Sequence, residues 1–300
     1  MQDIKKIDVH AHVTPYPEFA PLQFTGERFI SAPELIKKYD QLNIEKGVLL
    51  PIVSSEYQPE IFTSSDCAHV ASEYPDRFLW FCGIDPRAYG NTASADLSVL
   101  INHYKNLGAK GIGETTCQLY FDDPYLDNLL YHATLCNMPV TIHLAPRVGG
   151  YYGIVDDLGL TRLEKMLKKH KKLKILGHST MFWSHISGDV SHENIHAYGV
   201  GNVKEGRLAE LLRDYEGLYC DMSAGSGMNA FMRDEEYATR FLDEFADKLL
   251  YGCDICLNSQ NFALDFDKFL DKLVLENKLS LQNYKKIVRE NAIKVLKLDK

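Results

Sequence analysis

Eight short apolar segments recur along the chain, each bounded by polar or turn-forming residues. Such runs are typical of β-strands that are covered on both faces. They occupy residues 4–12, 46–53, 78–86, 109–115, 139–145, 173–179, 217–224 and 248–255. Between them, apolar residues recur at helical spacing over 32–42, 124–135, 162–170, 207–215 and 240–248. Ser31 and Pro124 stand where helices would begin, since serine caps a helix and proline suits its first position.

The regular alternation of strands and helices predicts a parallel sheet. Eight such units close naturally into a (β/α)8 TIM barrel, and the α/β barrel is therefore the predicted fold class, with an open doubly wound sheet as the alternative. No proline-rich linker, charge block or internal repeat divides the sequence, so residues 1–300 are expected to form a single domain. Two further helical stretches, 260–275 and 281–298, are expected to pack outside the barrel.

Composition and charge narrow the class of partner. The chain has 300 residues, of which 45% are hydrophobic and 25% charged, as in an ordinary globular protein. Its formal net charge of -8 provides no basic surface for a nucleic acid backbone, so a small-molecule substrate is the expected partner. Assembly into a homo-oligomer remains open.

The chain lacks the sequence features of export and membrane insertion. Its first residues, MQDIKKIDVHAH, contain no apolar stretch like that of a signal peptide, and no segment reaches the roughly 20 apolar residues that span a bilayer. The 7 cysteines are odd in number and lack the spacing of a disulfide framework. These features predict a cytoplasmic protein with reduced thiols and no membrane partner.

Side chains that bind metals stand at the ends of the predicted strands. His10 and His12 end the first strand two residues apart, a spacing that lets both imidazoles face one ion. Alone, this pair is a weak signal, and two histidines that only form hydrogen bonds at a polar strand end are the alternative. Further candidates end later strands in the same way: Glu114, His143, His178 and Asp254. In a TIM barrel the carboxyl ends of the strands form the active site, so six such side chains at one rim predict a metal centre.

The motifs at these strand ends, in their order and spacing, resemble the amidohydrolase superfamily and more closely its amidohydrolase-related branch, which also contains metal-dependent decarboxylases. The resemblance covers nearly the whole chain and is carried by DVHAH, YPDRFLWFCGIDP, PVTIHLA, GHSTMFW and LLYGCDI. It implies a metal held by His10, His12, His143 and Asp254. It also implies that His178 is a second ligand or an acid/base beside the metal.

The fourth strand offers two candidates for a ligand that bridges two ions. Many two-metal members of the superfamily have a carbamylated lysine there, but Lys110 lies about 13 Å deeper than the rim at the usual strand rise. Glu114 is the better candidate. It could instead accept a hydrogen bond from a ligand histidine and only orient it.

Histidine and carboxylate ligands suit Zn²⁺ best, with Mn²⁺, Fe²⁺ or Ni²⁺ as alternatives, bound as one ion or two. A divalent ion lowers the pKa of a coordinated water to about 7 and polarises a carbonyl group, so the set predicts a metal-dependent hydrolase of a small-molecule ester, lactone or amide. Asp254 is the expected base, and His178 is expected to stabilise developing charge.

Three further residues are candidates for substrate contact, each with a structural alternative. Arg147 could pair with a substrate carboxylate or form a surface salt bridge. Trp183 stands in a long connection after the sixth strand and could cover the substrate. Ser223 could line the pocket or only form hydrogen bonds at a strand end.

Two other functions compete with hydrolysis. The first is metal-dependent decarboxylation of an aromatic or vinylic carboxylic acid, which a single ion without Glu114 would favour. The second is a catalytically inert metal-containing barrel that binds a ligand. The retained ligand set argues against the inert barrel, because buried histidines and carboxylates with no use would only incur a desolvation cost.

Overall fold

The structure is a computed structural model that describes residues 4–23, 25–56 and 60–298. Its parallel strands form two sheets, one with the order β1-β2-β3 and one with the order β4-β5-β7-β8-β9. The barrel strands are β1 (Lys6–Ala11), β2 (Ile44–Leu49), β3 (Phe78–Trp80), β4 (Ile112–Thr115), β5 (Val140–Ala145), β7 (Ile175–His178), β8 (Leu218–Asp221) and β9 (Leu249–Leu250). Seven of them lie within segments that the sequence predicted, and β2 overlaps the segment predicted over 46–53 but begins earlier, at Ile44.

Backbone contacts join the two sheets into a closed barrel. A parallel bridge between Cys82 and Ile112 connects the third and fourth strands. On the other side, the Val9 amide donates to the Tyr251 carbonyl at 3.1 Å, and the Asp254 amide donates to the His10 carbonyl at 2.9 Å. The last strand therefore returns to the first, and the predicted (β/α)8 barrel is confirmed.

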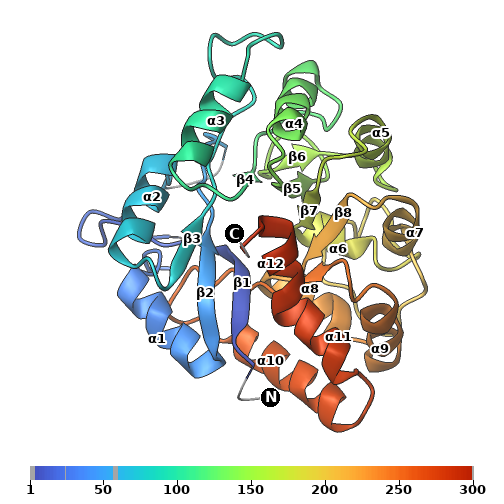
Figure 1. The fold of residues 1–300 in the computed structure, drawn as a ribbon. Helices are drawn as coiled ribbons and strands as arrows, with labels where there is room; N and C mark the ends of the chain where they lie inside the picture. Colours follow the sequence, from blue (N-terminus) through green and yellow to red (C-terminus); the bar gives the residue numbers. More distant parts are fainter. Residues whose placement is uncertain (1–3, 24, 57–59, 299–300) are drawn as a thin grey trace.

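Helices surround the strands (Figure 1). They are α1 (Ala32–Leu42), α2 (Ser64–Glu73), α3 (Ser98–Asn106), α4 (Pro124–Leu135), α5 (Thr161–Lys169), α6 (Thr180–Ser184), α7 (Arg207–Asp214), α8 (Ala224–Met232), α9 (Glu235–Glu244) and α10 (Phe262–Leu275). The first begins as predicted, because Ser31 and Glu34 form a reciprocal capping box. The helix expected over 240–248 instead begins at Glu235, because the Asp234 carboxylate caps it by accepting from the Tyr237 amide.

The C-terminal stretch is segmented. The helix expected over 281–298 is divided into α11 (Leu281–Lys285), a π-helical turn η1 (Lys286–Glu290) and α12 (Asn291–Leu296). In Figure 1, α12 lies in the middle of the view with the other helices around it. Three of its apolar side chains, Ala292, Val295 and Leu296, pack in one buried cluster with side chains from the strands and the residues next to them. These are Ile7, Val9, Val48, Leu50, Phe81, Leu176, Tyr219 and Leu250. The helix therefore packs outside the barrel, as predicted, and against the interior side chains.

The opposite end of the barrel carries long connections. The segment between α6 and α7, residues 185–206, has no helix, and the connection after β5 contains a short additional strand, β6 (Ile154–Val155), which pairs with Leu144 and Ala145. Among the described residues, no helix is long and apolar enough to cross a membrane. The connections at this end of the strands surround the site described next.

Candidate metal centre

The two histidines of β1 face each other across a short gap. His10 Nε2 and His12 Nε2 are 3.0 Å apart, and both residues are buried. Two ligands on one tetrahedral zinc ion, with bonds of 2.0–2.1 Å, would be separated by about 3.3 Å. The separation is therefore close to the one that a shared ion requires.

The partners of the other ring nitrogens fix the tautomers of these histidines. His12 Nδ1 lies 2.9 Å from the Leu50 carbonyl oxygen, which can only accept, so His12 Nδ1 must carry the proton. His10 Nδ1 lies 2.6 Å from Asp221 Oδ2 and donates to that carboxylate. In their neutral forms, both histidines then direct an Nε2 lone pair into the same gap. Such an arrangement of acceptors fits a cation, and a carboxylate on the far nitrogen of a ligand histidine is a common feature of metal sites.

Two carboxylates extend this set of acceptors. Asp254 Oδ1 lies 3.7 Å from the Nε2 atoms of both His10 and His12. Glu114 Oε2 lies 3.4 Å from His12 Nε2 and 3.7 Å from His10 Nε2. The described residues contain two groups that could hold an ion, His10 with His12 and Asp254, and His10 with Glu114 and His178. Nitrogen and carboxylate oxygen donors are the ligands of zinc and of other divalent transition metals, so the residues present fit such an ion.

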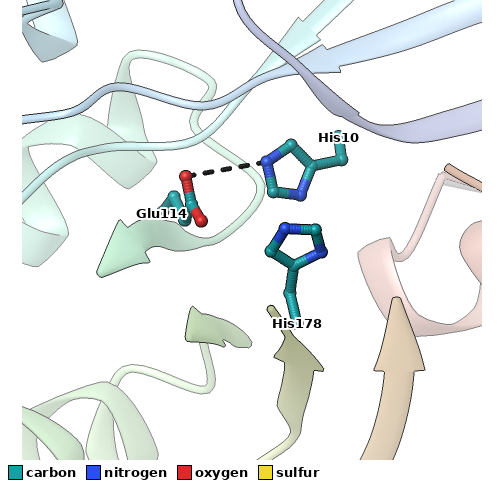
Figure 2. Close-up of side chains that lie close together, drawn as sticks. All are labelled: His10, Glu114 and His178. Carbon is teal, nitrogen blue, oxygen red and sulfur yellow. Dashed lines mark ion pairs between the residues drawn. The ribbon is translucent and has the colours of Figure 1, made fainter. Parts of the chain in front are cut away.

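His178 faces His10 from β7, and Glu114 reaches both from β4 (Figure 2). The His10 and His178 ring centroids are 4.3 Å apart. Burial, and then the neighbouring His10, lower the pKa of His178 to about 4. His178 is therefore neutral near pH 7. Ser223 Oγ lies 3.0 Å from its Nδ1 and orients the ring.

Glu114 is placed so that either role left open by the sequence is possible. Its Oε1 accepts a hydrogen bond from His143 Nδ1 at 2.6 Å, while its Oε2 faces the His10 and His12 pair. Although burial alone would raise the pKa of Glu114, the adjacent His143 and His10 hold it well below the usual range. His143 lies outside both ligand groups in this arrangement. With Nδ1 bound to Glu114, its Nε2 is the nitrogen left for a ligand or a substrate.

Asp254 is the most open of the acidic residues at the centre. Its side chain is 20% exposed, whereas that of Glu114 is 4% exposed. Its backbone has a φ of 53°, a left-handed conformation that is uncommon outside glycine and that marks functional positions in many enzymes. The Cys256 thiol lies 3.2 Å from Oδ1, in position to donate a hydrogen bond. Asp254 thus lines the cavity while contacting the histidine pair.

The three candidates for substrate contact occupy different surroundings. Arg147 is exposed and stacks on the Tyr151 ring at 5.3 Å, without lining the main cavity. Trp183 is buried and donates from its indole Nε1 to the Asp221 carbonyl oxygen at 3.0 Å. Ser223 is buried against His178. None of the three lines the main cavity, so their contact with a substrate stays a prediction.

The structure also reveals two acidic residues whose roles the sequence did not indicate. Asp221 is buried and supports His10 from β8, on another strand of the barrel. Asp8 accepts hydrogen bonds from the backbone amides of His10 and Cys253 and from the Tyr39 hydroxyl at 2.6 Å. It therefore ties the ends of the first and last strands together. Burial raises the pKa of Asp8 to about 7 against these hydrogen bonds.

A cavity of about 550 Å³ opens beside the centre. Its walls include five of the six candidate ligands, His10 being fully buried behind them. The other walls come mainly from the connection after β1, from the first turn of α8 and from the segment after β9: Gln23, Thr25, Phe29, Tyr152, Ser179, Thr180, Tyr198, Ala224, Gly225, Ser226, Cys256, Leu257, Gln260 and Phe262. This volume is typical of a small-molecule site.

Solved structures of known proteins share this fold at low sequence identity. An uncharacterised TIM-barrel protein from Bordetella bronchiseptica has a TM-score of 0.67 and 17% identity, covering 98% of this chain and 99% of its own. A probable 2-pyrone-4,6-dicarboxylic acid hydrolase from Acinetobacter baumannii has a TM-score of 0.59 and 14% identity, covering 98% and 100%. A 5-carboxyvanillate decarboxylase from Novosphingobium aromaticivorans, complexed with manganese, has a TM-score of 0.62 and 16% identity, covering 99% and 97%.

The sequence itself places the chain in a family. No curated protein matches it. The model of the amidohydrolase family, however, matches residues 7–298, a range that includes all six strand-end residues of the centre. Because this match extends over nearly the whole chain, and the barrel and its histidine and carboxylate rim agree with it, the chain belongs to the amidohydrolase family.

Proposed function

We propose that this protein is a metal-dependent hydrolase of a small-molecule ester, lactone or amide bond. The position of Asp254 is the observation that carries the proposal. Its carboxylate contacts the histidine pair and lines the cavity of about 550 Å³. Hydrolysis needs a base at this place, within reach of both the metal ligands and a substrate.

His10, His12 and Asp254 would hold the ion, with Glu114 and His178 as further ligands. Zinc is the preferred ion for this donor set, and manganese is the main alternative. When bound, a divalent ion supplies a Lewis acid that polarises the scissile carbonyl and acidifies water. Asp221 and the Leu50 carbonyl keep the two histidines in the tautomer that presents Nε2.

The chain's own groups provide the proton transfers. Water adds to the acyl carbon, and an Asp254 carboxylate oxygen takes its proton. The acyl–oxygen or acyl–nitrogen bond then breaks, and Asp254 returns the proton to the leaving atom. His178 Nε2 lies 3.8 Å from Asp254 Oδ2, so the imidazole can stabilise charge beside the same carboxylate.

Decarboxylation of an aromatic or vinylic acid is the second candidate. It is favoured because the two groups of residues that could hold an ion both include His10. His10 belongs to both groups that could hold an ion, but its Nδ1 is bound to Asp221, and a single Nε2 cannot ligate two separate ions. The arrangement as it stands therefore suits one ion, which is one of the two conditions of the decarboxylase alternative. The other condition is a site without Glu114, whose Oε2 here faces the histidine pair. Structural neighbours include both a probable hydrolase and a decarboxylase, which supports keeping both reactions in the screen.

A screen in isotopically labelled water tests the proposal. The metal-loaded protein is incubated in H₂¹⁸O with lactones, esters, amides and aromatic carboxylic acids, and the products are analysed by mass spectrometry. A hydrolase gives a product carboxylate that contains one solvent ¹⁸O and releases no CO₂. Release of CO₂ together with a product that has lost its carboxylate and contains no solvent ¹⁸O would instead establish the decarboxylase.

The control is the His10→Ala, His12→Ala double variant, prepared and loaded in the same way. Activity that persists in this variant would come from a contaminant or from a site other than the proposed one. Activity that disappears together with the bound metal supports the assignment of the centre.

A further inference from the structure

A second, smaller cavity of about 150 Å³ adjoins the main one. Thr180, Tyr198 and Ser226 line both cavities, so the two share a wall. The smaller cavity lies between the segment 185–206 and the helix α8, and its lining includes Trp183, Ser187, Gly199, Asn229 and Arg233. A dry engineered cavity of about 150 Å³ holds a benzene molecule, so a group of that size fits here.

Arg233 provides the guanidinium in the lining of this cavity. It follows the last residue of α8, and its Nε is buried without a hydrogen-bond partner. Its guanidinium makes no ion pair with any residue that the structure describes. By contrast, the nearby Arg213 pairs with Glu205 and Glu244. An unpaired guanidinium in a partly buried place is costly, and such groups in native proteins call for an explanation.

The acidic residue next to Arg233 in the sequence and the one that shares its cavity are occupied by other partners or exposed. The side chain of its neighbour Asp234 accepts hydrogen bonds from the Val203 and Tyr237 amides. Asp189 also lines the cavity, but it is exposed and forms no ion pair with Arg233. The cavity thus presents a positive charge that the neighbouring acids do not neutralise by contact.

The backbone around the cavity leaves room for this arginine. A Cβ on Gly199 would lie 2.0 Å from Arg233 Nη1, so the guanidinium occupies the space that a side chain at position 199 would fill. In the same way, a Cβ on Gly225 would lie 2.7 Å from the Tyr198 hydroxyl, at the wall that the two cavities share. The absence of side chains at these positions allows both polar groups to reach the boundary of the cavities.

Ser187, in the lining of the smaller cavity, also has a polar group without a partner. It lines the smaller cavity, it is 1% exposed, and its hydroxyl has no hydrogen-bond partner. A buried hydroxyl without a partner costs free energy unless a bound group satisfies it. An unpaired cation and an unpaired donor therefore occur together, and a carboxylate satisfies both kinds of group.

We infer that the smaller cavity binds a carboxylate group at the far end of the substrate, with Arg233 as its main partner. This inference rests on the proposed function in one respect: the other end of the substrate is assumed to bind at the metal centre. Arg233 then acts in substrate selection and not in bond cleavage. Arginine suits this role because its planar fork can donate two parallel hydrogen bonds to one carboxylate.

Calorimetry with linear dicarboxylates tests the inference without a known substrate. The metal-loaded protein is titrated with butanedioate to decanedioate and with the monocarboxylates of matched length. One chain length should bind about 10- to 100-fold more tightly than its monocarboxylate, the effect of one hydrogen-bonded charged group. Arg233→Met should abolish this gain while monocarboxylates still bind.

Arg240→Met is the matched control, because it removes an equal charge from an exposed side chain that lines neither cavity. This variant should keep the full gain. Gly199→Ala is the second test, since the added methyl displaces the guanidinium without removing its charge, and it should reduce the gain. It remains informative if Arg233→Met does not fold.

Three results would overturn the inference: no preferred chain length in the parent, an unchanged gain in Arg233→Met, or an equal loss in Arg240→Met. These outcomes are separate from those of the proposed function. If the protein is a decarboxylase that prefers one dicarboxylate length through Arg233, the proposed hydrolysis is refuted and the carboxylate site is supported. If it is a hydrolase without any preferred dicarboxylate length, the proposed hydrolysis is supported and the carboxylate site is refuted.

Discussion

The hydrogen bond between His10 and Asp221 leads to a prediction for Asp221→Asn. Asp221 is fully buried, and its two oxygens have separate donors, His10 Nδ1 at 2.6 Å and the Ser223 amide at 3.0 Å. An asparagine offers one acceptor where the structure requires two. If its oxygen faces His10, its NH₂ group faces the Ser223 amide. If the side chain turns, the NH₂ group faces His10 Nδ1 and favours the tautomer that protonates Nε2.

Either orientation weakens the presentation of Nε2 to a metal. Loss of such a supporting group typically lowers metal affinity by about 10- to 100-fold, which is roughly 1.4 to 2.7 kcal/mol. Affinity is measured by competition between the protein and a chromogenic chelator for Zn²⁺ and for Mn²⁺. The melting temperature is recorded in parallel, so that a loss of metal affinity can be separated from a loss of fold.

Asp156→Asn is the matched control. Asp156 is also a buried aspartate, and it accepts hydrogen bonds from the amides of Asp157, Arg162 and Leu163 at the start of α5, apart from the groups that could hold an ion. We expect this variant to lose stability and to keep its metal affinity. Parental metal affinity in Asp221→Asn would refute the reasoning, as would an equal loss of affinity in both variants.

Three further predictions concern the ligands and the base. The His10→Ala, His12→Ala double variant should lose the metal in elemental analysis, because both Nε2 donors are gone; a fully loaded variant would show that the ligands are wrong. Asp254→Asn should lower turnover by about 10²- to 10⁴-fold on any identified substrate, since an amide cannot take a proton from water. Near-parental turnover would remove Asp254 from the mechanism. Glu114→Gln should lower metal occupancy at limiting Mn²⁺, the second ion first where two bind, and unchanged occupancy in elemental analysis would exclude Glu114 as a ligand.

The sequence predicted those parts of the site that depend on strand geometry. Apolar runs located all eight barrel strands, and strands in a closed barrel bring their carboxyl ends together. The candidates from β1, β4, β5, β7 and β9 therefore converge because the fold requires it. His10 and His12 face the same gap, as their spacing of two residues predicted.

The supporting residues could not be predicted in this way. Regular alternation would direct Asp8 to the same face as His10, but the pairing of β1 with β2 shifts between Asp8 and Ala11, and Asp8 bonds to Tyr39 on α1. The contact between His10 and Asp221 joins residues 211 positions apart, and no local pattern encodes it. The smaller cavity depends on the path of the segment 185–206, which has no regular structure to predict.

A crystal structure at saturating Mn²⁺, with the ions located by anomalous scattering, would show directly whether these residues bind a metal. We expect an ion within bonding distance of His10 Nε2, His12 Nε2 and Asp254 Oδ1, with a Glu114 oxygen in contact with it. An ion at another place, or an ion at this place with the Glu114 carboxylate turned away from it, would refute the proposed metal centre. The second of these results would favour the decarboxylase over the hydrolase.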